Sequence, residues 1–109
     1  MIVIRNNILP PSGFVAINLF GILFVRKGYE MKIETYNHEA IHSAQMKEML
    51  IIGFYLWYII EWIVRLFQYG FSHRAYRNIS FEREAYTNQN NLDYLSTRKR
   101  LSWINYLRK

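Results

Sequence analysis

The sequence predicts a small α+β fold that is mainly helical. Residues 14–26 are rich in β-branched and aromatic side chains, which is typical of strands. The only two prolines are Pro10 and Pro11, so nothing after them prevents long helices. The chain has 109 residues, which predicts a single domain over residues 1–109. We therefore expect an N-terminal β-hairpin followed by helices.

The strand region is expected to form the hairpin. Residues 14–26 suit one bent strand or two short strands, with Gly21 at a bulge or a turn. Lys27 and Gly28 indicate a turn, and the alternation of apolar and polar residues over 31–35 predicts a returning strand.

Three helices are expected after the hairpin. Thr35 or Asn37 can cap the first helix, and Gly53 is a place where it can break. Ser80 is the expected N-cap of the second helix, and the third is short with one apolar face. The predicted ranges are 37–67, 80–98 and 101–107.

The composition is that of a folded protein with an excess of apolar surface. Hydrophobic residues make up 51% and aromatic residues 17% of the chain, while 20% are charged. So much apolar surface in a small protein predicts contact with a membrane, a partner chain or a substrate. There is no cysteine, so disulfides and thiolate metal sites are excluded. A transition-metal site would have to use histidine and carboxylate ligands.

The formal net charge is +6, and basic residues gather at the C-terminus. A solvated basic helix end is the first interpretation, and contact with anionic lipid headgroups is the second. No nucleic-acid recognition motif accompanies the charge, so we expect no nucleic-acid partner. Residues 1–9 lack the features of a signal peptide, which predicts a cytoplasmic protein with or without membrane association.

Residues 49–67 have nearly the length of a membrane span, but the apolar run stops at Glu61 after twelve residues. Glu61 and Arg65 are four residues apart and can pair on one helix face. A helix covered by the core or by a partner is the first interpretation, a helix lying on the membrane the second, and a true span the third. The second is favoured by residues typical of membrane interfaces: Tyr55, Trp57, Tyr58 and Trp62.

The segment His38-Glu39-Ala40-Ile41-His42 predicts a zinc site. In a helix, residues four apart point the same way, so His38 and His42 can bind one ion. Their imidazoles suit zinc. Glu39 would lie beside the ion, where a carboxylate can accept a proton from a metal-activated water. The alternative is two unrelated histidines on an amphipathic helix.

A catalytic zinc site usually has a third protein ligand, and His73 and Glu82 are the candidates. Glu82 and Glu84 cannot both face one ion from a regular helix, because they are two residues apart. For both glutamates the alternative role is stabilisation of the helix N-terminus. Gln45, one turn beyond His42, either lines the site, hydrogen-bonds to a ligand, or is merely exposed.

The motif at His38–His42, followed by Glu82-Arg83-Glu84-Ala85-Tyr86, resembles the gluzincin metallopeptidases, including the single-domain minigluzincins. The resemblance implies that Glu82 is the third zinc ligand. Gluzincins usually carry an aspartate, which supports a ligand histidine, where this chain has Tyr86. A phenol can also hydrogen-bond to an imidazole or an oxyanion. The wider sequence is similar to small bacterial proteins with the same order of parts, which implies no substrate.

Two functions follow as hypotheses. In the first, the chain is a zinc metallopeptidase with Glu39 as the base, and a peptide adds to an edge strand within residues 14–26. In the second, zinc staples a non-catalytic module that binds a membrane or a partner chain. Small size favours the second, unless a partner chain completes a cleft.

Overall fold

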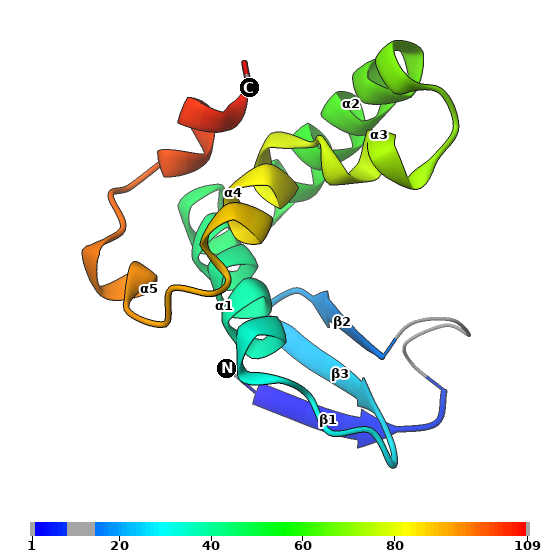
Figure 1. The fold of residues 1–109 in the computed structure, drawn as a ribbon, viewed down its shortest axis with the longest axis vertical. Helices are drawn as coiled ribbons and strands as arrows, with labels where there is room; N and C mark the ends of the chain where they lie inside the picture. Colours follow the sequence, from blue (N-terminus) through cyan, green and yellow to red (C-terminus); the bar gives the residue numbers. More distant parts are fainter. Residues whose placement is uncertain (1, 9–14, 109) are drawn as a thin grey trace.

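The computed structural model describes residues 2–8 and 15–108, and it has the predicted α+β fold, mainly helical (Figure 1). A three-stranded sheet comes first along the chain and the helices follow. Its strands lie in the order β1-β3-β2, with β1 parallel and β2 antiparallel to β3. The strands are β1 (Ile2–Asn6), β2 (Ala16–Leu19) and β3 (Ile22–Arg26).

The predicted hairpin is confirmed as two short strands, β2 and β3. Phe20 and Gly21 form the turn between them, with φ angles of 56° and 86°. Two consecutive residues with positive φ are typical of a tight hairpin turn, which explains the glycine at position 21. Strand β1 was not predicted, and it pairs with β3 over its whole length.

The predicted returning strand over residues 31–35 is wrong. Helix α1 (Ile33–Glu48) begins within this segment. β1 already occupies the edge of β3 that a returning strand would have used, so no partner is left there. Lys32 is the N-cap of α1, so Thr35 and Asn37 do not cap it. The side chain of Asn37 instead donates to the backbone carbonyls of Asn88, Gln89 and Asn91.

The predicted helix over residues 37–67 is two helices, α1 and α2 (Ile52–Tyr69), bent by 111°. The break lies at residues 49–51, just before Gly53, where Leu50 and Ile51 have φ angles of 55° and 61°. In the described part of the chain, no single helix is long and apolar enough to cross a membrane. Only α1 and α2 taken together pass such a test of length and composition.

The predicted helix over 80–98 ends early. It is replaced by α4 (Ser80–Asn88), a turn and the short α5 (Tyr94–Thr97). Ile79, not Ser80, is the N-cap of α4. The last predicted helix is a 3₁₀ turn, η1 (Ser102–Tyr106), and α3 (His73–Arg77) was not predicted at all.

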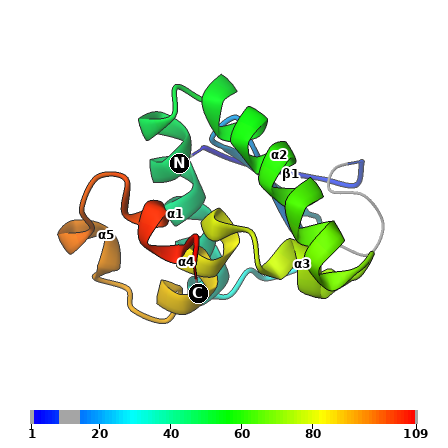
Figure 2. The same cartoon turned by 90° about the horizontal axis from the view of Figure 1, so that it is seen from above.

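Helix α1 lies between the sheet and α4, so both of these elements pack against the helix that carries the histidine motif (Figures 1 and 2). The apolar core forms where α1, α2, α4 and η1 meet. Its buried members are Met46, Phe54, Ile79, Phe81 and Trp103.

A buried carboxylate, Glu61, joins α2 to the start of α4. It accepts hydrogen bonds from the backbone N–H of Ser80 at 2.6 Å and from the Ser80 hydroxyl. It also pairs with Arg65, one turn along α2, at 3.0 Å. Buried charges are stable only when they are paired and hydrogen-bonded, and Glu61 satisfies both conditions.

We expect Glu61→Ala to lower the free energy of unfolding by about 3–5 kcal/mol, because it leaves Arg65 buried without its counter-charge. Urea unfolding followed by circular dichroism measures this. Glu30→Ala removes an exposed carboxylate and should change stability by less than about 0.5 kcal/mol. Equal effects of the two substitutions would contradict the role given to Glu61.

Candidate metal centre

His38 and His42 lie one turn apart on α1 and point toward Glu82 in the first turn of α4. The Nε2 atoms of the two histidines are 3.1 Å apart. Oε1 of Glu82 lies 3.2 Å from His38 Nε2 and 3.1 Å from His42 Nε2. All three side chains are buried, and together they could hold a metal ion.

Gln45 determines which nitrogen of His42 carries a proton. Its amide nitrogen donates to the carbonyl of Phe81 at 3.1 Å and to Glu84 at 2.9 Å. Its oxygen therefore faces Nδ1 of His42, at 2.8 Å, and Nδ1 must be the donor. The lone pair of His42 then lies on Nε2, the atom that faces Glu82.

Gln89, in the turn after α4, holds the second histidine in the same way. Its side-chain oxygen lies 2.8 Å from Nδ1 of His38 and accepts a hydrogen bond from it. The lone pair of His38 is thus also on Nε2. Two imidazole lone pairs and one carboxylate oxygen converge, and acceptors this close need a positive charge among them.

A zinc ion fits this donor set. Zinc binds imidazole nitrogen and carboxylate oxygen at about 2.0–2.2 Å, and tetrahedral coordination then separates the ligand atoms by about 3.3–3.5 Å. The observed separations of 3.1–3.2 Å are close to that value. Small outward movements of the side chains would bring the three atoms to coordination distance.

In the absence of a metal, a proton supplies the positive charge. Burial by itself would lower the pKa of His42, but the attraction and hydrogen bond of Glu82 outweigh burial and raise that pKa to about 9. Burial likewise favours the neutral form of Glu82. The two histidines overcome this effect and hold the pKa of Glu82 below its usual value.

Glu39 follows His38 on α1 and is partly exposed. Burial raises the pKa of its carboxyl group, and the nearby His42 and His38 partly offset that rise. Its backbone carbonyl accepts a hydrogen bond from the side chain of Asn18 at 2.9 Å, which ties strand β2 to α1. The edge of the sheet is thereby held next to the motif.

A pocket of about 620 Å³ lies beside this cluster, and Glu39, His42 and Glu82 all contribute to its wall. The remaining walls come from all four residues of β2 and from segments of α1, α2 and α3. Most of these residues are apolar or aromatic. They include Leu19, Met46, Phe54, Tyr55, Tyr58 and Trp62.

Two tyrosines contact the cluster from different sides. Tyr58 of α2 donates its hydroxyl to Oε2 of Glu82 at 2.8 Å, so only Oε1 faces the histidines. The ring of Tyr86 packs edge-on against that of His38, with centroids 4.5 Å apart. Tyr86 therefore contacts His38 through its aromatic ring. The Nδ1 atoms of the two histidines are hydrogen-bonded instead to the side-chain amides of Gln45 and Gln89.

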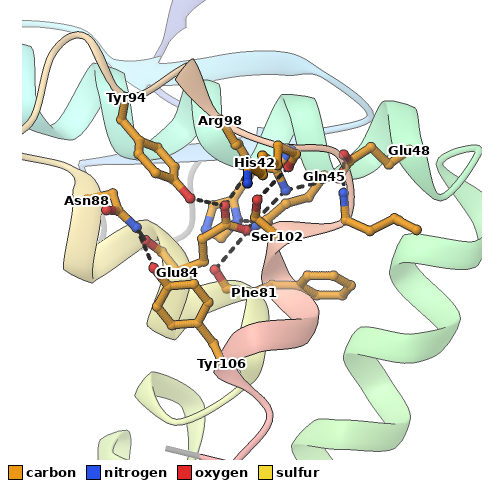
Figure 3. A network of polar contacts seen from close by, with 12 residues as sticks. His42, Gln45, Glu48, Phe81, Glu84, Asn88, Tyr94, Arg98, Ser102 and Tyr106 are labelled. Carbon is orange, nitrogen blue, oxygen red and sulfur yellow. Dashed lines mark hydrogen bonds and ion pairs between the residues drawn. The ribbon is translucent and has the colours of Figure 1, made fainter. Parts of the chain in front are cut away.

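A second layer of buried charge lies behind Gln45 (Figure 3). Glu84 is fully buried and accepts hydrogen bonds from Gln45, from the Tyr94 hydroxyl and from Arg98. Arg98 also pairs with Glu48 of α1 at 2.9 Å. Glu84 thus faces away from the histidine pair, as its spacing from Glu82 requires.

The residues that sequence reasoning missed are Tyr58, Gln89 and the Glu84–Arg98 pair. Gln89 follows Glu82 by seven residues, about two helical turns. This spacing could have indicated that the two side chains lie on the same helix face. His73, the alternative third ligand, is exposed and does not join the cluster that the described residues form. It lines the same pocket and packs near Tyr76.

No family model, curated protein or solved structure matches this chain. The described residues bring His38, His42 and Glu82 together in a cluster that could hold a metal ion.

We expect Gln45→Leu to weaken metal binding at the cluster by about 10- to 100-fold, because His42 loses the acceptor that fixes its tautomer. Competition with a chromophoric chelator measures the affinity, and circular dichroism checks the fold. Gln68→Leu makes the same chemical change on the exposed end of α2 and should leave affinity unaltered. An unchanged affinity in a folded Gln45→Leu protein would contradict the assignment.

Proposed function

We propose that this chain is a zinc metallopeptidase of the gluzincin type, in which His38, His42 and Glu82 bind the ion. The observation that carries this proposal is the convergence of three buried acceptor atoms beside Glu39 and an apolar pocket. Two imidazoles and a carboxylate form a ligand set typical of catalytic zinc, which leaves a further coordination position open.

Each residue of the cluster has a distinct role in this proposal. Zinc bound there would polarise a peptide carbonyl and make a water molecule acidic near neutral pH. Glu39 lines the same pocket wall as His42 and Glu82, where its carboxylate can take a proton from that water and deliver it to the leaving amine. Tyr58 holds the second oxygen of Glu82, which orients the carboxylate.

The edge strand β2 provides a place for an extended peptide. β3 pairs with only one side of β2, and the other side has no partner strand among the described residues. All four residues of β2 line the pocket. A substrate that pairs with this edge would pass the cluster, and the apolar walls favour an apolar side chain near the cleaved bond.

The non-catalytic alternative also has a supporting observation. The exposed fractions of His38, His42 and Glu82 are only 5%, 5% and 3%. Such burial suits a structural ion that links α1 to α4 and stabilises the fold. A pocket of about 620 Å³ against the cluster favours the enzyme, because a purely structural zinc site needs no adjoining cavity.

The metal itself is tested first. We expect the purified chain to contain about one zinc per molecule by elemental analysis, and His38→Ala to lose it, since two ligands bind weakly. His73→Ala removes an exposed histidine outside the cluster and should keep its zinc. A His38→Ala protein with full zinc content would overturn the proposed site.

Catalysis is tested separately. We expect the wild-type chain to cleave members of a peptide library, and Glu39→Gln to reduce the rate by about 10²- to 10⁴-fold while zinc stays bound. Glu34→Gln, in the first turn of the same helix, is the matched control and should keep full activity. A zinc-loaded wild-type chain that cleaves no peptide would instead support the stapled, non-catalytic module.

A further inference from the structure

The polarity of α2 is the reverse of that expected for a helix in water. Its charged residues, Glu61 and Arg65, are buried and paired with each other. Six of its large apolar residues face outward and are at least half exposed. They form an outer stripe of Ile52, Leu56, Ile59, Ile60, Ile63 and Phe67.

The outer stripe is continuous along the helix, because its members recur at intervals of three and four residues. Figures 1 and 2 show α2 at the periphery of the molecule, with one side turned away from the other elements. Eighteen residues of helix extend over about 27 Å. An exposed apolar stripe of this length marks an interaction surface.

The exposed charged residues that precede and follow α2 in the sequence are all basic. Glu61 is the only acidic residue between positions 49 and 81, and it is buried. The exposed charged residues that flank α2 are Lys47 before it and Arg74 and Arg77 after it. This distribution is complementary to an anionic surface.

Two tryptophans add an independent observation. Trp57 and Trp62 are 38% and 41% exposed. A rotation of 100° per residue places them on opposite flanks of the outer stripe. Tryptophan is enriched at the level of lipid headgroups, and a helix lying in the membrane plane brings both of its flanks to that level.

We propose that α2 lies in the plane of an anionic bilayer surface, with the outer stripe in contact with the acyl chains and the basic residues at its ends in contact with headgroups. The helix lies along the membrane, because its inner face packs on the protein and carries the buried Glu61–Arg65 pair. A second copy of this chain is a poorer occupant, because antiparallel pairing of two α2 helices would bring Lys47 toward Arg74.

This surface adjoins the pocket, because Trp62 belongs both to the flank of the outer stripe and to the pocket wall. Docking on a membrane would therefore hold the pocket close to the lipid headgroups. Binding of this surface to a membrane depends on α2 and on the basic residues that flank it, and it does not require a metal.

Co-sedimentation of the full chain with vesicles tests this surface. We expect binding to vesicles of phosphatidylcholine mixed with phosphatidylglycerol, and much weaker binding to phosphatidylcholine alone. The double variant Ile60→Ser/Ile63→Ser should bind roughly tenfold or more weakly. Leu92→Ser changes a residue that is 51% exposed outside α2 and should bind as the wild type does.

A second variant tests the charge separately and leaves the outer stripe intact. Lys47→Gln/Arg74→Gln should weaken binding to the anionic vesicles by about fivefold per charge removed, with little change on neutral vesicles. Circular dichroism checks the fold of each variant.

Three results would overturn the proposal. The first is no binding of the wild-type chain to anionic vesicles. The second is an equal loss of binding in Leu92→Ser and in the double serine variant. The third is a dimer in solution that ignores vesicles and is dissociated by Ile60→Ser/Ile63→Ser, which would assign α2 to a second copy of the chain.

Discussion

The side chain of Gln45 is the contact on which the positions of α1, α4 and the candidate metal centre depend. Its nitrogen donates to Phe81 and Glu84 on α4, and its oxygen accepts from His42 on α1. If the Gln45 amide were turned over, its N–H groups would face the N–H of His42. Its oxygen would face the oxygens of Phe81 and Glu84. One fully buried side chain therefore fixes both the tautomer of His42 and the docking of the helix that carries Glu82.

Local patterns were sufficient for part of the fold. The β-branched run gave the β2–β3 hairpin, and the absence of proline after Pro11 allowed the helices. Strand β1 was missed because its parallel pairing with β3 is a long-range contact that no local pattern encodes. The break between α1 and α2 lies close to Gly53, as expected. Its sharp bend was not predicted, because Leu50 and Ile51 adopt positive φ, a conformation that their residue types disfavour.

The sequence was more informative about the candidate site than about its surroundings. His38 and His42 follow a fixed helical spacing, and the resemblance pointed to Glu82. Tyr58 reaches Glu82 from a helix whose direction depends on the bend after α1, so its contact could not be predicted. The pairing of Glu61 with Arg65 was expected, but its burial was not, because spacing alone does not say which face of a helix is turned inward.

The hydrogen bond from Tyr58 to Glu82 connects α2 directly to the histidine cluster. Tyr58 belongs to the inner side of the helix whose outer side carries the apolar stripe, and Glu82 belongs to the histidine cluster. A ligand on the outer face that shifted α2 would also shift Tyr58, the hydrogen-bond partner of Glu82. Thermodynamic reciprocity would then couple ion binding at the cluster to binding at the outer face by the same factor.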